Sequence, residues 1–467
     1  MTFRKRIKIL SNDIRFWILL FFLLRLIGII NPPLEISHNW RQSLTNMIAR
    51  NFFEIDSNIL YPRIDMAGNA TGIIGSEFPF FNYLIYLVSM VFGFEHWYGR
   101  LINLIVSSFG IYFFYRLIAR ICNSRIAFNS ALVLLSSIWF AFSRKIMPDT
   151  FSVSLVLIGL FYCYDYLMSG ARWKLILYFC FATLGILCKI PALCLLSALG
   201  ILVFVKTIEK ERKFLVYLTS IISVSIVALW YFNWVPYLLF TYNYPLYFPK
   251  GIIEGIYEIL PLLPQFFEKF YFSSLSSYIA LACFLGGLIL LLRSKDNYLK
   301  AGIGFTTLIF LIFIIKTGSV FPLHNYYVIP FTPVMALIAG YGIARVSIRY
   351  QFIILFLIAF EGIANQQHDF FIKDSERYKL SLEKVSDAYI GKKELVVING
   401  GQSPQQIYFL HRKGWTVENA FLTKENLDSL KILGAEYLVQ NRHLPEVKIE
   451  FYPLLGSTES FNVYRIE

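Results

Sequence analysis

The chain has 467 residues, of which 57% are hydrophobic and 18% aromatic but only 16% charged. Its mean hydropathy of +0.58 lies far from the balance of a water-soluble globular domain. The net charge of +13 would suggest a nucleic-acid partner in a soluble protein, but here the cations stand mostly in short loops between apolar runs. The composition therefore indicates a membrane protein and excludes a nucleic-acid-binding one.

The first apolar run, 14–31, follows a basic stretch at 4–8, which is also the pattern of a signal peptide. The residues after the run, Asn31-Pro-Pro-Leu34, offer no small-residue cleavage site. We therefore expect a retained first helix whose N-terminus is cytoplasmic.

Further apolar runs follow along the chain, each with the length and composition of a membrane-spanning helix, so that we count about eleven in all. The candidate spans are 14–31, 97–119, 126–142, 150–168, 174–188, 190–207, 214–235, 274–292, 299–316, 328–345 and 350–366.

Lys and Arg gather in alternate short loops, as expected for loops on the cytoplasmic side. They are Arg120 and Arg125; Arg172 and Lys174; Lys206, Lys210, Arg212 and Lys213; Arg293, Lys295 and Lys300; Arg345 and Arg349. This alternation predicts that the long segments 32–96 and 236–273, the short loop 317–327 and the tail from about 367 lie outside. We expect a multi-pass protein of the plasma membrane, the inner one where there are two.

The segment 32–96 carries two helical stretches, 40–53 and 80–92, that suit helices lying along the membrane surface. It also holds the pattern Ser37-His-Asn-Trp-Arg-Gln42 and, later, Ser76-Glu-Phe-Pro79. A solvated loop would explain each charged residue singly, but long ordered loops are usually functional. The candidate site residues in this segment are His38, Arg41, Asp65 and Glu77.

Three further outer positions carry ionisable groups. Asp149 ends Ser143-Arg-Lys-Ile-Met-Pro-Asp149 at a helix start, where a structural role would be an N-cap. Lys189 stands in a tight turn before Pro191, where the alternative is snorkelling to the interface. His324 lies in Phe321-Pro-Leu-His-Asn-Tyr-Tyr327, and its neighbours favour a polar site over an isolated structural histidine.

The tail from 367 has short strand-like and helical patterns instead of long apolar runs. Residues 394–399 and 437–439 are strand-like, and 427–433 are helical. We expect two domains: a transmembrane domain at 1–366 with outer loops 32–96 and 236–273, and a small extracytoplasmic α/β domain at 367–467. The six cysteines lie within or at the ends of apolar runs without a pairing pattern, so we assign them packing roles.

In their order and sidedness, these motifs resemble those of the GT-C superfamily, glycosyltransferases that depend on polyprenyl-phosphate sugars, such as protein O-mannosyltransferases and lipid A aminoarabinose transferase. The resemblance covers nearly the whole chain and implies a GT-C-like fold. The motifs that carry it are Glu77-Phe-Pro79, Gly99-Arg-Leu101, Asp149, Lys189 with Pro191, and His324-Asn-Tyr-Tyr327.

The resemblance implies that Glu77 and His324 lie near the donor phosphate or a bound divalent metal, and that Lys189 contacts that phosphate. Two candidate ligands do not by themselves define a metal site. The chain departs from the family in its first outer loop, where the usual Asp-Glu pair is replaced by His38-Asn-Trp-Arg-Gln42. The identity of the residue that activates the acceptor therefore stays open.

The implied reaction is an inverting transfer of a hexose or pentose from a polyprenyl-phosphate donor to a hydroxyl of a glycan, lipid or protein acceptor. Cations must neutralise the phosphate, and a carboxylate or imidazole must deprotonate the acceptor. The electrostatic candidates are Lys189, Arg41, Arg100, His324 and Tyr327, and the candidate bases are Asp149, His38 and Asp65. The alternatives are a polysaccharide polymerase or ligase that uses a diphosphate-linked lipid, and a secondary transporter, against which stands the absence of repeated halves.

Overall fold

The computed structural model describes residues 13–243 and 250–466 and divides into two compact units. Unit 1 comprises 13–29, 100–233 and 250–370, and unit 2 comprises 30–99, 234–243 and 371–466. The basic stretch at 4–8 lies outside the described residues.

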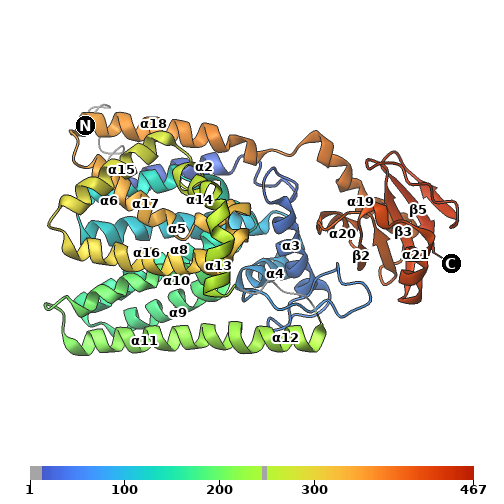
Figure 1. Cartoon of the computed structure of the whole chain (residues 1–467), viewed down its shortest axis with the longest axis horizontal. Coiled ribbons are helices and arrows are strands. Elements are labelled where there is room, and N and C mark those ends of the chain that lie inside the picture. Colours follow the sequence, from blue (N-terminus) through green and yellow to red (C-terminus); the bar gives the residue numbers. More distant parts are fainter. Residues whose placement is uncertain (1–12, 244–249, 467) are drawn as a thin grey trace. The chain divides into compact units, whose positions relative to one another are not determined.

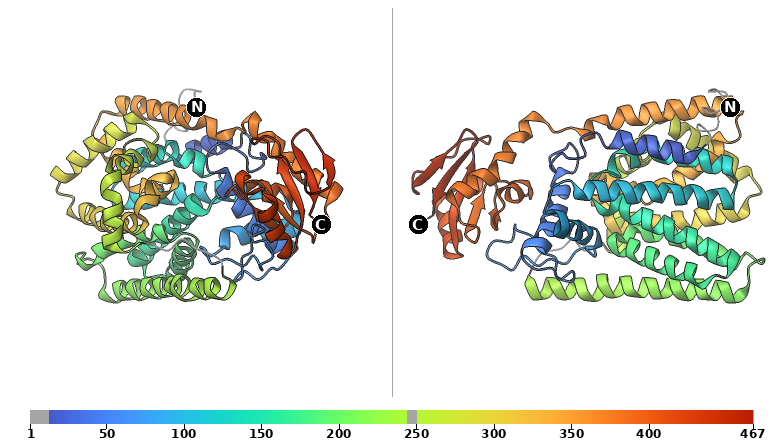
Figure 2. Two further views of the ribbon diagram at one scale, coloured as in Figure 1. Left: turned by 45° about the vertical axis from the view of Figure 1, so that its right-hand side comes forward. Right: turned by 180° about the vertical axis from the view of Figure 1, so that it is seen from behind.

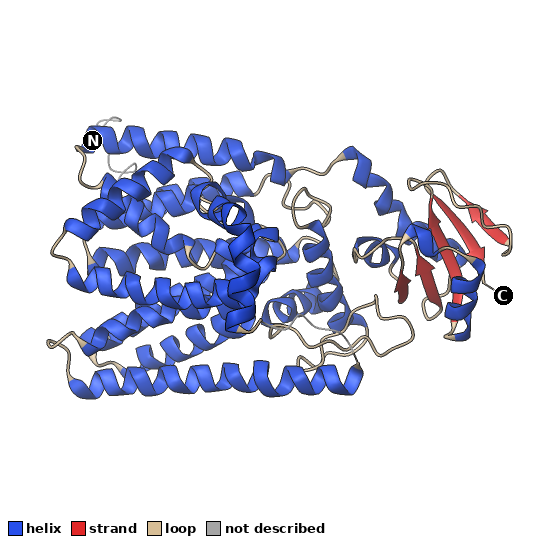
Figure 3. Cartoon of the chain, viewed as in Figure 1, coloured by secondary structure: helices blue, strands red, loops and turns tan. Residues whose placement is uncertain are grey.

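Unit 1 is built from helices (Figures 1 and 3). They are α2 (Ile14–Arg25), α5 (Tyr98–Ile121), α6 (Ser124–Ser136), α7 (Trp139–Phe142), α8 (Pro148–Ser169), α9 (Arg172–Cys188), α10 (Leu193–Leu196), α11 (Lys210–Leu229), α13 (Ile252–Ile259), α14 (Leu263–Glu268), α15 (Tyr278–Arg293), α16 (Asn297–Thr317), α17 (Thr332–Ile343) and α18 (Ile348–Gln366).

The helices of unit 1 run side by side (Figure 2). Small residues let some of them approach closely. Helix α8 packs on α9, and α6 packs on both α17 and α18. At Gly340 of α17, a Cβ atom would lie only 2.5 Å from the backbone nitrogen of Ser130 in α6. Small residues at such crossings are typical of helices that pack within a membrane.

Five helical segments in the described ranges are long and apolar enough to cross a membrane, and a bent pair can supply a sixth. The five are Tyr98–Ile121, Pro148–Ser169, Lys210–Tyr242, Asn297–Leu323 and Ile348–Phe370, and the pair is Ile252–Ser273 with Tyr278–Arg293, bent by 100°. This confirms a multi-pass helical membrane protein. The count of eleven spans stays a prediction, because runs such as 190–207 break into short helices after Pro191.

Unit 2 joins residues 30–99 to the C-terminal residues. Its helices are α3 (Asn39–Glu54), α4 (Phe80–Phe92), α12 (Val235–Tyr242), α19 (Leu382–Tyr389), α20 (Gln405–Leu410) and α21 (Lys424–Ile432). One apolar core combines Met47 and Phe52 of α3 with Ile407 and Tyr408 of α20. Helix α3, predicted to lie along the membrane surface, is therefore covered by protein, with most of Gln42–Phe52 buried.

The predicted C-terminal strands belong to a five-stranded sheet (Figure 3). Its strands are β1 (Leu395–Ile398), β2 (Gly414–Thr416), β3 (Ala435–Asn441), β4 (Leu454–Ser457) and β5 (Phe461–Arg465), in the order β2-β1-β3-β5-β4. Strands β2, β1 and β3 are parallel, whereas β5 and β4 are antiparallel to their neighbours. Side chains alternate between two cores: Val396 and Ile398 face α20, and Val397 packs with Leu427 of α21.

The predicted small α/β domain is thus present, but it does not pack as a separate body from 367. The structure groups 371–466 with 30–99 in one unit, because residues 30–99 supply part of the core beneath the sheet. Roughly 100 residues can build only a modest core alone, so residues 30–99 add apolar surface that the sheet can bury.

Candidate active site

The turn between α7 and α8 in unit 1 carries several buried polar and charged side chains. Ser143, Arg144, Lys145 and Asp149 are each at most 3% exposed. The amide nitrogen of Asn103 lies 3.1, 2.9 and 3.2 Å from the carbonyl oxygens of Phe142, Lys145 and Met147. One side chain of α5 therefore clamps the turn, which holds its charged residues in place.

Three cations of this region are buried and engaged. Lys145 Nζ lies 3.2 Å from a carboxylate oxygen of Asp369. The Arg144 guanidinium stands 4.0 Å from the ring centroid of Phe370, and Arg25 donates a hydrogen bond of 2.5 Å to the Ser143 hydroxyl. The sequence analysis did not single out these groups. A signal was present in Arg25, because an ionisable residue inside an apolar run is a functional candidate by default.

Asp149 and Lys189 come together because α8 and α9 approach closely. A Cβ atom at Gly185 of α9 would lie 2.9 Å from the Ser152 carbonyl oxygen in α8, so only glycine permits this spacing. Helix α9 ends at Cys188, and Lys189 follows in extended backbone. Its Nζ atom lies 3.9 Å from Asp149 Oδ1, and the two side chains are 14% and 4% exposed.

Asp149 is not the N-cap of α8. That position belongs to Met147, which makes no side-chain capping hydrogen bond, and Pro148 and Asp149 form the first turn. The carboxylate still lies at the positive end of the helix, where the interaction with the dipole is worth about 0.3–1 kcal/mol at an exposed site. The N-cap explanation for this residue is therefore wrong, and the Asp149 carboxylate instead faces the Lys189 ammonium.

The link between α16 and α17 brings an aromatic group to the same lysine. Lys189 Nζ lies 5.6 Å from the ring centroid of Tyr326. That ring stacks on His324 at 5.0 Å, and His324 meets Tyr327 edge to face at 5.3 Å. Lys269 donates a hydrogen bond of 2.7 Å to Asn325 in the same link. Asp149, Lys189, His324 and Tyr327 thus belong to one cluster, and Tyr326, which was not among the candidates, connects them.

The remaining candidate of unit 1, Arg100, lies near the start of α5 and is fully buried.

In unit 2, His38 and Arg41 lie at the start of α3. Ser37 and His38 both have positive φ angles, 66° and 55°, which non-glycine residues adopt at a cost. Such strain persists where the surrounding structure enforces it and clusters at functional sites. Arg41 forms an ion pair with Glu77, so two candidates that the sequence placed near the donor are partners of one another.

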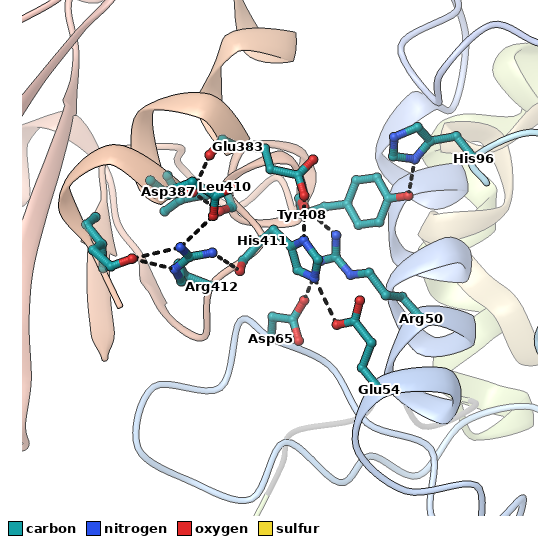
Figure 4. A network of polar contacts seen from close by, with 12 residues as sticks. Arg50, Glu54, Asp65, His96, Glu383, Asp387, Tyr408, Leu410, His411 and Arg412 are labelled. Carbon is teal, nitrogen blue, oxygen red and sulfur yellow. Dashed lines mark hydrogen bonds and ion pairs between the residues drawn. The ribbon is translucent and has the colours of Figure 1, made fainter. Parts of the chain in front are cut away.

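Asp65, the third candidate base, is held in a buried network (Figure 4). One carboxylate oxygen accepts a hydrogen bond of 2.9 Å from Arg50, and the other accepts one of 2.9 Å from Asn51. Arg50 also donates to the Tyr408 carbonyl oxygen and stands 4.6 Å from the Tyr408 ring centroid. Both oxygens of Asp65 are therefore held by α3, and its partner Arg50 connects α3 to α20, which is a structural role.

His411 joins α3 to α19 in the same network (Figure 4). Its Nδ1 lies 2.7 Å from Glu383, and its Nε2 lies 2.8 Å from Glu54. Two carboxylates, one at each ring nitrogen, favour the doubly protonated imidazolium. The hydrogen bond with Glu383, and then that with Glu54, raises the pKa of His411, while burial and the nearby Arg50 oppose this.

We predict that this contact makes the stability of unit 2 depend on pH. Because folding raises the pKa of His411, its contribution is complete below the unfolded value of about 6.5 and is lost as pH rises through the folded pKa. The half-exposed carboxylates limit the effect to ~1 kcal/mol or less for each pair. Thermal unfolding of the full-length protein should show a His411→Gln variant below wild type at pH 6, with a smaller gap at pH 9. His443→Gln, at an exposed histidine, should show no such change, and a gap that is independent of pH would contradict the prediction.

Within the described residues, no group of three or more His, Cys, Asp and Glu side chains could hold a metal ion. Glu77 is engaged by Arg41, and it belongs to unit 2 whereas His324 belongs to unit 1. Metal binding by Glu77 and His324 stays a prediction, and no step of the proposed reaction uses a metal.

The comparisons with known proteins agree with this architecture. The sequence model of the dolichyl-phosphate-mannose-protein mannosyltransferase family matches residues 76–231, a segment that contains Glu77, Arg100, Asp149 and Lys189. A search of curated proteins gives no match.

Two solved structures share the fold at low sequence identity. ArnT from Cupriavidus metallidurans bound to undecaprenyl phosphate has a TM-score of 0.63 and 12% identity, over 96% of this chain and 98% of that one. The oligosaccharyltransferase AglB from Archaeoglobus fulgidus, in complex with an inhibitory peptide and a dolichol-phosphate, has a TM-score of 0.55 and 12% identity, over 91% of this chain and 69% of that one.

The class of protein that this fold defines is a helical multi-pass membrane protein in which residues 30–99 and a C-terminal sheet form one unit. The family match and the two similar structures confirm the predicted resemblance, and the chain has the fold of the GT-C superfamily.

Proposed function

We propose that this chain is an inverting glycosyltransferase that moves a sugar from a polyprenyl-phosphate donor to an acceptor hydroxyl on the outer face of the membrane. The observation that carries the proposal is the cluster of Asp149, Lys189, Tyr326 and His324 beside a clamped, buried turn. The fold is shared with ArnT bound to undecaprenyl phosphate, which supports a lipid-phosphate donor.

The proposed transfer needs a cation to neutralise the phosphate and a base to deprotonate the acceptor, and the cluster offers one of each. Negative charge grows on the phosphate as the bond to the anomeric carbon breaks, and Lys189 neutralises it from a flexible four-carbon stem. Asp149 accepts the proton of the attacking hydroxyl. Buried surroundings strengthen both interactions, since little water screens them. A single displacement inverts the configuration at the anomeric carbon.

The proposal is tested with purified protein, a polyprenyl-phosphate monosaccharide and a mixture of envelope acceptors. Release of free polyprenyl phosphate with an inverted anomeric linkage is expected. Release of polyprenyl diphosphate from a diphosphate-linked oligosaccharide, with no cleavage of the monophosphate, would instead favour a polymerase or ligase. Movement of the intact lipid without cleavage would favour a transporter.

We expect Lys189→Ala to raise KM for the lipid donor about 10-fold or more, because a hydrogen bond to a charged group is worth ~1.5–3 kcal/mol. Steady-state kinetics with the donor varied gives this value. Lys174→Ala is the matched control, since Lys174 lies at the other end of α9 and pairs with Asp165. If Lys189→Ala leaves donor kinetics unchanged while the protein stays folded, Lys189 serves only at the membrane interface.

The outer location of the site rests on the alternation of basic loops. It predicts a cytoplasmic N-terminus and an extracytoplasmic unit 2. A reporter that is active only in the cytoplasm, fused after Glu467, should be silent, and the same reporter fused within the loop at 206–210 should be active. An active reporter at the C-terminus would require a different number of spans and would place Asp149 and Lys189 on the wrong side.

A further inference from the structure

The C-terminal sheet has a chain reversal that the proposed reaction does not use. Strands β2, β1 and β3 are parallel and adjacent, so their carboxyl ends share one edge. From β1 the chain passes to β2 on one side and then returns across β1 to β3 on the other. In sheets of this kind, ligands bind outside the carboxyl ends of the strands, at the point where the strand order reverses.

A glycine pair follows β1 at this edge. A Cβ atom at Gly400 would lie 2.8 Å from Thr416 Oγ1 and 3.3 Å from Gln406 Cβ, so the bare backbone of Gly400 packs directly against these two side chains. Gly401 has a φ of 65°, which favours glycine. Both glycines are partly exposed. A larger residue at Gly400 would displace Thr416 or Gln406, so the loop needs glycine to approach the side chains at this edge.

Amide side chains connect the ends of the three strands. Asn399, which is fully buried after β1, donates a hydrogen bond of 2.8 Å to Asn419 beyond β2. The backbone N–H of Asn441, at the end of β3, donates one of 2.6 Å to the side-chain Oδ1 of Asn399. The edge is thus a connected polar layer built from neutral groups.

Two amide groups next to this layer lack a partner within the described residues. They are Gln405 Nε2 and Gln406 Oε1, on side chains that are only 4% and 6% exposed. The other end of Gln405 accepts a hydrogen bond of 2.8 Å from Lys379, whose charge is paired with Glu376. Buried polar atoms are nearly always hydrogen-bonded, and leaving them unpaired is costly. The Gln405 Nε2 donor and the Gln406 Oε1 acceptor therefore each require a hydrogen-bond partner from outside the described residues.

We propose that this edge binds an uncharged saccharide, whose hydroxyl groups both donate and accept hydrogen bonds. A hydroxyl can satisfy Gln405 Nε2 as an acceptor and Gln406 Oε1 as a donor. The neutral amides and the paired lysine offer an anion no unpaired charge. The use of this site rests on the proposed function. The bound saccharide is then the acceptor glycan, which unit 2 holds while the sugar is transferred to it. The acceptor is then a glycan rather than a protein or a lipid.

Binding is tested without a lipid donor, so that it does not depend on catalysis. Full-length protein in nanodiscs is applied to an array of uncharged and acidic oligosaccharides. We expect retention on a set of uncharged glycans, and a loss of affinity of about 10-fold in Gln406→Leu and in Gln405→Leu, as an absent hydrogen bond predicts. Gln402→Leu, at an exposed residue of the same loop, should bind as wild type does.

The thermal unfolding midpoint separates a lost contact from a lost fold. Because Gln406 Oε1 has no partner within the described residues, Gln406→Leu should not lower the midpoint, and Gln406→Met is the second variant if Gln406→Leu unfolds. Gln405→Leu also removes the acceptor of the Lys379 hydrogen bond, so a somewhat lower midpoint is expected for that variant. Retention on acidic glycans alone, no retention on any glycan, or equal affinity in wild type and both Leu variants would overturn the inference and assign the amides to an enclosed water. Glycan binding that persists when donor cleavage is absent would sink the proposed reaction but not this site.

Discussion

Asp149→Asn should lower turnover by ~10²-fold or more while the protein remains folded, since general-base catalysis typically contributes about 10²–10⁴-fold. The substitution keeps the shape of the side chain but removes the group that takes the acceptor proton. It also removes the charge that faces Lys189 at 3.9 Å. Turnover at saturating donor and acceptor measures the effect, and the unfolding midpoint confirms that the variant is folded.

The structure sharpens this experiment, because Met147 rather than Asp149 occupies the N-cap of α8. Loss of a cap therefore cannot account for a fall in activity. Asp165→Asn is the matched control: it lies on the same helix, pairs with Arg120 and Lys174, and should leave turnover near the wild-type value. Wild-type turnover in a folded Asp149→Asn protein would move the role of base to His38, to be tested with His38→Ala.

Asp65→Asn should destabilise unit 2 by ~3–5 kcal/mol, because removing one charge of a buried pair leaves the other uncompensated. The side chains of Arg50 and Asp65 are only 4% and 9% exposed, and the pair holds α3 against α20. A lower unfolding midpoint of the full-length protein is the expected result. Turnover of the fraction that remains folded should stay near that of wild type.

The neighbouring pair of Arg63 and Asp56 provides the control, since these side chains are 22% and 39% exposed. Asp56→Asn should cost less than ~1 kcal/mol, the range of surface pairs. If Asp65→Asn instead kept its unfolding midpoint and lost turnover, Asp65 would be the catalytic base that the sequence also allowed, and the network in Figure 4 would be secondary.

Residue type and position along the chain were enough to find several members of the candidate site. Asp149, Lys189 and His324 stood out because ionisable groups at the ends of apolar runs are rare and costly. Tyr326 could not be selected in this way. Its place in the site depends on its own ring lying near both Lys189 and His324, which only the folded structure shows. Lys145 could not be selected either, because its partner Asp369 lies in a distant part of the chain.

The sequence by itself determined the membrane class, the positions of most helices and the presence of strands at 394–399 and 437–439. These properties follow from local composition and periodicity, because a spanning helix satisfies its own backbone and needs only an apolar run. Only the tertiary structure decided that α3 is buried against α20, that Gly185 brings Lys189 to Asp149, and that Asp65 pairs with Arg50. Each of these depends on the close packing of segments that are distant in sequence, and no local pattern encodes which distant side chain completes a buried charge.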